Sequence, residues 1–173
     1  MKSLVVYSSL TGNTERVARA VYEALPEPKT IAPVADAPDP AGFDFVAIGY
    51  WVDKGMPDSR AQKFMATVQG AHVGLFGTLG AEPDSDHAKE CIRKGEELMA
   101  GNTVHGSFLC QGRIDPKIIE AMQKMAADVH PMTPERIARI KEAEKHPDEQ
   151  DLANAREAFA GIIQSAKEAM AHA

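Results

Sequence analysis

Three hydroxyl-bearing side chains lie close together near the start of the chain, in the stretch SLTGNT at residues 9–14. The apolar residues 4–7 before this stretch predict a buried strand, and apolar residues at helical spacing from Val17 to Leu25 predict a helix that begins at its end. The first turn of a helix has unpaired N–H groups and about half a positive charge, and neighbouring hydroxyls add donors. The order of strand, polar turn and helix start therefore predicts an anion site, with phosphate as the first candidate ligand.

Composition narrows the class of partner. The chain of 173 residues carries a formal net charge of −6, which disfavours nucleic acid because such a partner needs a concentrated basic face. An acidic surface suits a basic partner protein instead. The first apolar stretch is too short for a signal peptide and no run reaches the length of a membrane helix, so we expect a cytoplasmic protein without a membrane partner. Cys91 and Cys110 lack metal-ligand spacing, which indicates reduced core thiols.

Strand and helix patterns alternate along the first two thirds of the chain. Four further strands are expected at residues 30–34, 43–50, 73–77 and 103–110, and the first of them is predicted at a sheet edge because it contains Pro33. The segments between them predict helices. Strands separated in this way imply βαβ crossovers, so the expected fold class is α/β with a parallel sheet covered on both faces.

The last third of the chain is predicted to be helical. Asp115-Pro116 and Thr133-Pro134 each have the pattern of an N-cap followed by proline at the first helical position, and His146-Pro147 interrupts the pattern before a final helix. Three helical pieces thus follow the fifth strand, where a minimal five-stranded sheet needs one. We expect a single domain over residues 1–173, with residues 113–150 as a helical insertion before the last helix.

The polar loop differs from two common phosphate-binding loops. It lacks a lysine and the GxxxxGK[ST] pattern, and it also lacks the GxGxxG of dinucleotide-binding folds. SLTGNT directly after a first strand instead resembles the S/T-x-T-G-N-T loop with which flavodoxins hold the phosphate of FMN. The resemblance implies a flavodoxin-like doubly wound three-layer sandwich, a five-stranded parallel sheet of order 2-1-3-4-5 with extra C-terminal helices, and FMN as cofactor. The alternative is an ordinary turn in which Thr11 or Thr14 only caps the helix.

The resemblance also implies which residues meet FMN. In this sheet order the first, third and fourth strand–helix loops lie together. Trp51 is expected to stack on the isoalloxazine ring, and the alternative is a tryptophan wedged into the surface or an interface. For Tyr50 the sequence leaves two positions open, the core and the flavin edge. The predicted cofactor-binding residues are Ser9, Leu10, Thr11, Gly12, Asn13, Thr14, Tyr50, Trp51, Val52, Gly55, Thr78, Leu79 and Gly80.

The chain departs from the flavodoxin pattern at two places. Val52 stands where many flavodoxins have glycine after the loop tryptophan, and its branched side chain disfavours positive φ, so Gly55 is the candidate for that conformation. The second loop has no tyrosine for the outer flavin face, only Leu79, Pro83 and His87, and His87 is expected on the surface. We predict no catalytic residue and no metal ligand.

Two classes of function remain open. The first is a low-potential electron carrier that passes electrons from a reductase to an acceptor enzyme, and the second is an FMN-dependent NAD(P)H flavin or quinone reductase on the same fold. A binding module that has lost its flavin is a third, more remote class. The ring loops carry more carboxylates than cations, which opposes both a reduced, anionic flavin and bound NADPH, so we favour the carrier. These carboxylates are Asp53, Asp58, Glu82, Asp84 and Asp86.

Further similarities bear on the partner. The stretches GTLGAEPDSDHAKE and FLCQGRIDP are similar to flavodoxin-like accessory proteins encoded beside bilirubin reductase, which implies a redox partner enzyme. In the charged helix predicted after Thr133, Ile137 and Ile140 form a narrow apolar stripe. We expect this helix to border the flavin site and to contribute to the choice of partner.

Overall fold

The computed structural model describes residues 1–125 and 132–172. Five parallel strands form a sheet in the order β2-β1-β3-β5-β6, and a two-residue strand, β4, pairs antiparallel with β3. Because β4 lies outside the parallel series, this is the predicted order 2-1-3-4-5. The strands are β1 (Ser3–Tyr7), β2 (Lys29–Pro33), β3 (Phe45–Asp53), β4 (Met56–Pro57), β5 (His72–Leu79) and β6 (Thr103–Gln111).

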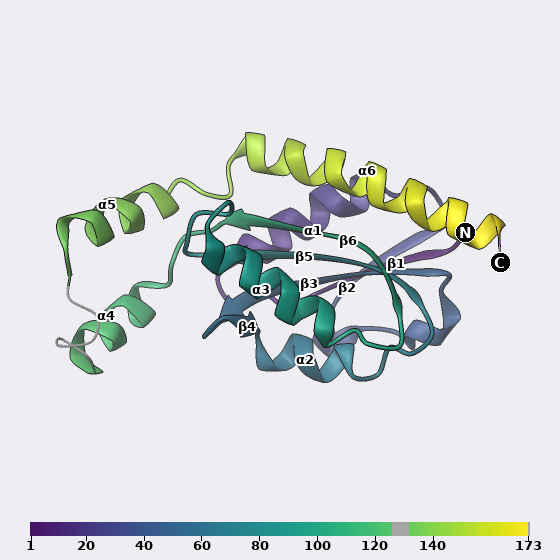
Figure 1. Ribbon diagram of the computed structural model, residues 1–173, viewed down its shortest axis with the longest axis horizontal. Coiled ribbons are helices and arrows are strands. Elements are labelled where there is room, and N and C mark those ends of the chain that lie inside the picture. The colour runs from purple at the N-terminus through teal and green to yellow at the C-terminus, as the bar shows by residue number, and fades with distance from the viewer. Residues whose placement is uncertain (126–131, 173) are drawn as a thin grey trace.

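Helices cover both faces of the sheet (Figure 1). One face packs against α1 (Asn13–Ala24) and α6 (Glu149–Ala171), and the other against α2 (Ser59–Met65) and α3 (Asp86–Glu97). Side chains of β3 alternate between the two cores, with Phe45 and Ala47 on the first face and Val46, Ile48 and Tyr50 on the second. The chain is therefore the predicted doubly wound three-layer α/β sandwich.

Short polar side chains fix where the helices start. Each accepts hydrogen bonds from backbone N–H groups in the first turn of its helix, which satisfies donors that the helix leaves unpaired. These caps are Asp58 for α2, Ser85 for α3, Thr133 for α5 and Asp148 for α6. Cys91 and Cys110 are buried free thiols, as predicted. Within the described residues no helix is both long and apolar enough to cross a bilayer.

Two strands run further than the sequence pattern indicates. β3 continues through Trp51 to Asp53 and reverses into β4, whereas the sequence predicts a loop there. The reversal occurs at Lys54-Gly55, where φ is 50° and 79°. β5 likewise includes Thr78 and Leu79, which the sequence places in a turn. Both extensions put predicted site residues on strands, which hold side chains more precisely than loops do.

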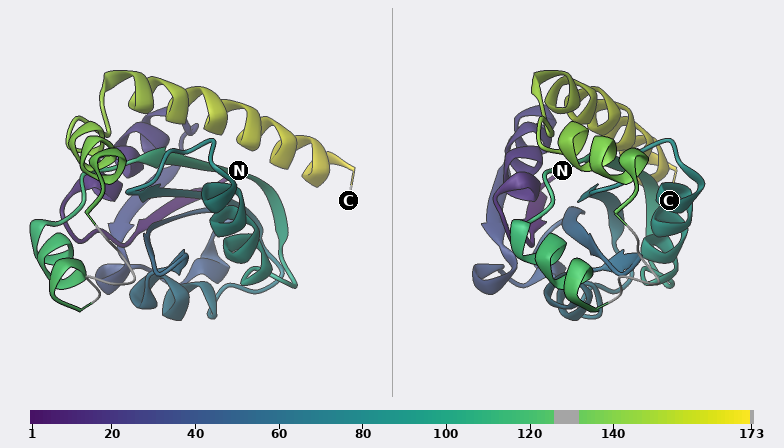
Figure 2. Two further views of the ribbon diagram at one scale, coloured as in Figure 1. Left: turned by 60° about the vertical axis from the view of Figure 1, so that its left-hand side comes forward. Right: turned by 90° about the vertical axis from the view of Figure 1, so that its left-hand side faces the viewer.

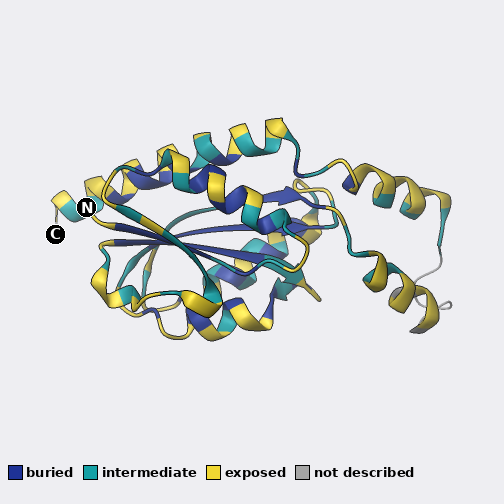
Figure 3. Cartoon of the chain, turned by 180° about the vertical axis from the view of Figure 1, so that it is seen from behind, coloured by how far each residue is buried: buried dark blue, intermediate teal, exposed yellow. Residues whose placement is uncertain are grey.

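Two helices project beyond the carboxyl ends of the strands, and we call α4 (Pro116–Met125) and α5 (Pro134–Ala143) the arm (Figures 1 and 2). Most of its described residues are exposed, in contrast to the sheet (Figure 3). The backbone N–H of Arg113 donates to the carbonyl of His146 at 3.0 Å, so the two roots of the arm lie side by side. That the arm is an insertion into the fold stays a prediction.

Candidate flavin-binding site

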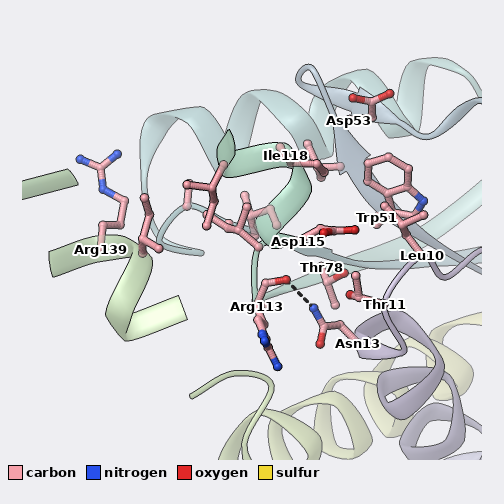
Figure 4. Close-up of a pocket in the computed structure, with 18 of the residues that line it drawn as sticks. Leu10, Thr11, Asn13, Trp51, Asp53, Thr78, Arg113, Asp115, Ile118 and Arg139 are labelled. Carbon is pink, nitrogen blue, oxygen red and sulfur yellow. Dashed lines mark hydrogen bonds between the residues drawn. The ribbon is translucent and has the colours of Figure 1, made fainter. Parts of the chain in front are cut away.

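The carboxyl ends of the parallel strands meet at a cavity with a volume of about 1170 Å³. The ends of β1, β3 and β5 line one part of it, as predicted, and the end of β6 and the arm line the rest (Figure 4). Most of the predicted cofactor residues belong to its wall. These are Leu10, Thr11, Asn13, Thr14, Trp51, Val52, Gly55, Thr78, Leu79 and Gly80.

The loop between β1 and α1 leaves backbone donors free. Ser9 Oγ accepts hydrogen bonds from the N–H groups of Gly12 at 3.1 Å and Glu15 at 3.4 Å, which fixes the loop from inside. Gly12 has a φ of 89°, which glycine adopts without strain, and it provides no side-chain cap. The N–H groups of Asn13 and Thr14 have no acceptor in the described part of the chain. The start of α1 therefore presents donors to an anion.

The two threonines of this loop have different surroundings. Thr14 is buried, and its Oγ1 lies 3.0 Å from Thr78 Oγ1, so one hydroxyl donates to the other. This bond joins the loop to the end of β5. Thr11 is exposed, lines the cavity and has no hydrogen bond within the described residues. Thr11 is thus the loop threonine whose hydroxyl is available to a ligand.

The backbone just after β6 contacts the loop between β1 and α1. Asn13 Nδ2 donates to the carbonyl of Arg113 at 2.9 Å (Figure 4). Gly112 makes this approach possible, because a Cβ there would lie 3.0 Å from Asn13 Nδ2 and 3.2 Å from Thr78 Cβ. Gly112 and Arg113 both line the cavity but were not among the site residues predicted from the sequence. The available signal was their position directly after the fifth strand, at the same edge of the sheet.

Trp51 occupies the wall opposite the arm. It pairs with Thr78 in the register of β3 and β5, is half-buried and lines the cavity (Figure 4). The next residue, Val52, has extended backbone and pairs with Pro57 of β4. Gly55 has the positive φ that the sequence assigned to it rather than to Val52. The indole therefore stands on a rigid hairpin beside the cavity.

Tyr50 does not belong to the cavity wall. Its side chain is 1% exposed and lies in the core beside α3, with Leu75 and Cys91 in the same cluster. Burial raises the pKa of its hydroxyl. Of the two alternatives that the sequence left open for this residue, core and flavin edge, the structure has the core. The reason is alternation along β3, which places Tyr50 on the same face as Ile48.

The arm supplies an apolar wall with cations nearby. Ile114 precedes α4, Ile118 belongs to it and Ile140 belongs to α5, and all three line the cavity half-buried. Arg139 is exposed and lies at the end of the cavity far from Trp51 (Figure 4). α5 borders the cavity through Ile140, while Ile137 is 40% exposed. Apart from Ile137 and Ile140, the sequence did not predict which residues of the arm would line the cavity, because they match no known binding motif.

The titratable side chains at the cavity do not form a nucleophilic centre among the described residues. His87 lines the cavity, and its Nε2 lies 3.7 Å from Cys91 Sγ. Burial raises the pKa of the Cys91 thiol, so at neutral pH it is protonated and a poor nucleophile. Asp115 serves α4 structurally, because its Oδ1 accepts from the N–H of Lys117 at 2.8 Å. The arrangement is suited to binding a ligand rather than attacking one.

The fold and the site together define a flavodoxin-like protein. The chain matches the flavodoxin domain family over residues 4–160, and it belongs to that family. It is 34% identical over 163 residues to a flavodoxin-like domain-containing protein BilS of Clostridioides difficile (strain CD3), across 88% of this chain and 90% of the relative. A protein of the same description from Clostridium symbiosum (strain WAL-14163) is 29% identical over 143 residues, covering 72% and 75%.

Solved structures share the fold. Oxidised flavodoxin 2 from Bacillus cereus superposes with a TM-score of 0.60 at 16% identity, over 95% of this chain and 99% of that one. A flavodoxin from the domain Archaea gives a TM-score of 0.59 at 20% identity, over 96% and 99%. At these identities the likeness concerns the arrangement of strands and helices.

Proposed function

We propose that this protein binds FMN and carries electrons between partner enzymes. The observation that supports this most directly is the start of α1, where the N–H groups of Asn13 and Thr14 and the hydroxyl of Thr11 have no hydrogen-bond partner among the described residues. A phosphate monoester fits this set of donors without a cationic side chain. The cavity next to it carries Trp51 on its wall, as an aromatic cofactor requires.

Bound FMN supplies reversible uptake and release of electrons, and the chain positions it. The loop at residues 9–14 anchors the phosphate through backbone donors and Thr11. Trp51 provides a flat apolar surface for the ring, and Gly55 allows the hairpin to turn next to it. The site residues thus act by binding and orientation, and an electron carrier needs no further catalytic group.

Electrostatics favour a carrier over an NAD(P)H-dependent flavin or quinone reductase. Asp53, the last residue of β3, and Glu82, which follows β5, are exposed carboxylates at the end of the sheet that carries the cavity. They oppose a further polyanion and also an anionic reduced flavin, which lowers the potential of the bound cofactor. No feature of the described residues favours the reductase.

Partner enzymes on both sides of the reaction follow from this role. The net charge of −6 suits a basic docking face on the reductase or the acceptor. The arm overhangs the cavity and is proposed to contribute to partner choice. A cytoplasmic location stays a prediction.

The phosphate site can be tested by comparing FMN with riboflavin, which lacks the phosphate. Thr11→Ala should weaken FMN binding by about tenfold or more, because a hydrogen bond to a charged group contributes about 1.5–3 kcal/mol. Riboflavin affinity should change little. Thr103→Ala is the matched control, since Thr103 is also an exposed threonine but begins β6 at the opposite edge of the sheet. Titration of the apoprotein by flavin fluorescence measures both ligands, and equal losses for the two would refute the assignment.

A further inference from the structure

Asp58 is a buried carboxylate directly behind the cavity wall. Asp58 is 2% exposed, and its backbone N–H donates to the carbonyl of Trp51 at 3.0 Å. The preceding residue, Pro57, pairs with cavity-lining Val52. On its other side, Ser8 Oγ donates to Asp58 Oδ1 at 2.7 Å, and Ser8 immediately precedes the anion-binding loop. The carboxylate thus lies between the two loops that would hold the phosphate and the ring of FMN.

The two carboxylate oxygens of Asp58 differ in their hydrogen bonding. Oδ1 accepts three hydrogen bonds, from Ser8 Oγ at 2.7 Å and from the N–H groups of Arg60 at 3.1 Å and Ala61 at 3.3 Å. Oδ2 is buried and has no hydrogen-bond partner, and within the described residues no Lys or Arg forms an ion pair with Asp58. Within the described residues this carboxylate is thus met only by hydrogen bonds to one of its oxygens, and no cationic side chain is paired with it.

We propose that Asp58 is a positioning residue for redox tuning: a fixed internal charge that disfavours the reduced flavin and sets a salt-independent part of its low potential. The proposal rests on the function proposed above and assigns that part of its electrostatics to one residue. Reduction adds negative charge to the flavin, and a carboxylate behind the wall opposes that charge through protein rather than through water.

Burial distinguishes Asp58 from the other carboxylates of the ring loops. Asp53, Glu82, Asp84 and Asp86 are all exposed. Interactions between exposed charges are largely screened beyond about 30 Å at 0.01 M ionic strength and beyond about 3 Å at 1 M. Interactions of buried charges are screened much less. The contribution of the exposed group should therefore vanish at high salt, and that of Asp58 should persist.

The experiment compares the two-electron midpoint potential of FMN-loaded wild type, Asp58→Asn and Asp53→Asn at low and high salt. Asparagine removes the charge but keeps an N-cap oxygen for α2. For Asp58→Asn we expect the affinity for reduced FMN, relative to oxidised FMN, to rise about tenfold, which is about 30 mV in potential. That shift should be the same at both salt concentrations. Asp53→Asn, the matched control on the same hairpin, should raise the potential at low salt only.

Further outcomes separate this inference from the proposed function. Asp58→Ser, whose hydroxyl also caps helices, replaces Asp58→Asn if the latter does not fold, as judged by the unfolding midpoint of the apoprotein. Failure of wild type to bind FMN at all would overturn the proposed function. Normal FMN binding with an unchanged potential in either Asp58 variant, or a shift that disappears at high salt, would overturn the role of Asp58 alone. If Asp58 had only a structural role, its substitution would lower the affinities for oxidised and reduced FMN equally, and the midpoint potential would not change.

Discussion

Individual side chains at the site divide into those that build it and those that face a ligand. Ser9 and Thr14 carry the hydroxyls expected to meet a phosphate, yet Ser9 holds its own loop together and Thr14 bonds Thr78. The Thr11 hydroxyl has no partner in the described part of the chain, and Trp51 lines the cavity. Substitutions at the first pair should therefore disturb the loop as a whole, while those at the second pair should act on the ligand.

Trp51 offers a direct optical test, because it is the only tryptophan in the chain. If it stacks on the flavin ring, its fluorescence should be quenched when FMN binds to the apoprotein and should recover when FMN is removed. Trp51→Ala should weaken FMN binding by about fivefold or more, since aromatic stacking contributes about 0.5–1.5 kcal/mol beyond area burial.

The matched variant at this position is Trp51→Phe, which keeps a smaller ring on the same hairpin and should bind FMN with intermediate affinity. Far-ultraviolet circular dichroism should be unchanged in both variants, because Trp51 is half-buried and lies outside both core clusters. Tryptophan emission that is the same with and without FMN would contradict stacking.

Residue types and their spacing predicted much of the candidate site. The sequence predicted the SLTGNT loop, Trp51 and Gly55 as site residues because each meets a local requirement: donors for an anion, a flat apolar surface, a positive φ. In the structure Gly55 has that φ, and Thr11 and Trp51 line the cavity, while binding of FMN by these residues stays a prediction. Tyr50 shows the limit. Its proximity to Trp51 along the chain suggested a shared role, but β3 extends through both residues, and a strand sends neighbours to opposite faces. Once the strand is known to continue, alternation alone assigns Tyr50 to the core.

At the scale of elements, the arm is tied to the start of α1. Arg16 Nη1 donates to the carbonyl of Pro147 at 2.6 Å, and Asn13 Nδ2 to that of Arg113. The second root of the arm is then joined to α6, where His146 Nδ1 lies 2.5 Å from Asp151 Oδ2. Asp151 also accepts from the N–H of Asp148 in the capping box that starts α6.

This junction should make stability depend on pH. The hydrogen bond to Asp151 raises the pKa of His146, against desolvation, and the charge of Asp151 and a bond to Glu142 raise it further. Because the pKa is higher in the folded state, the stabilisation is complete below the unfolded value, near 6.5, and is lost as pH rises through the folded value. We expect His146→Gln to lower the free energy of unfolding by about 1 kcal/mol near pH 5.5 and by less near pH 9.

Urea unfolding of wild type and His146→Gln at the two pH values measures this difference. His172 provides the comparison, because it lies at the exposed end of α6 and His172→Gln should change stability little at either pH. A destabilisation by His146→Gln that is equal at both pH values would show that the side chain acts by packing and not through its charge.

For the whole molecule, the parallel sheet, its cover of helices and the helices of the arm were predictable, but the direction in which the arm projects was not. Apolar runs separated by helical segments require crossovers, and only a few arrangements of such units bury both faces. Within the arm, Pro116 and Thr133 marked the helix starts correctly. Where the arm points depends on contacts between distant residues, such as Arg113 with His146, which no local pattern specifies. The residues after β6 were not predicted as part of the site, although their position directly after the fifth strand places them at the same end of the sheet.

A deletion of the arm that keeps its roots tests the proposed role of the arm in partner choice. Arg113 N and His146 O are 3.0 Å apart, so a short glycine linker can replace residues 117–144 while Asn13 and Arg16 keep their bonds to the roots. We expect the shortened protein to fold and to bind FMN within about threefold of wild type, because the phosphate donors and Trp51 lie on the sandwich. Its midpoint potential should be nearly unchanged, since Asp58 stays buried behind β3.

Electron transfer to the acceptor enzyme should slow in the shortened protein if, as proposed, the arm contributes to the surface that the partner touches. Stopped-flow oxidation of the reduced protein measures that rate, and oxidation by free ferricyanide, which needs no docking face, serves as the control reaction. Ile140→Ser within the intact arm should reproduce part of the slowing if the apolar wall is what the partner touches. A folded, shortened protein that no longer binds FMN would instead place the arm in the cofactor pocket, with Ile114, Ile118 and Ile140 as cover for the ring.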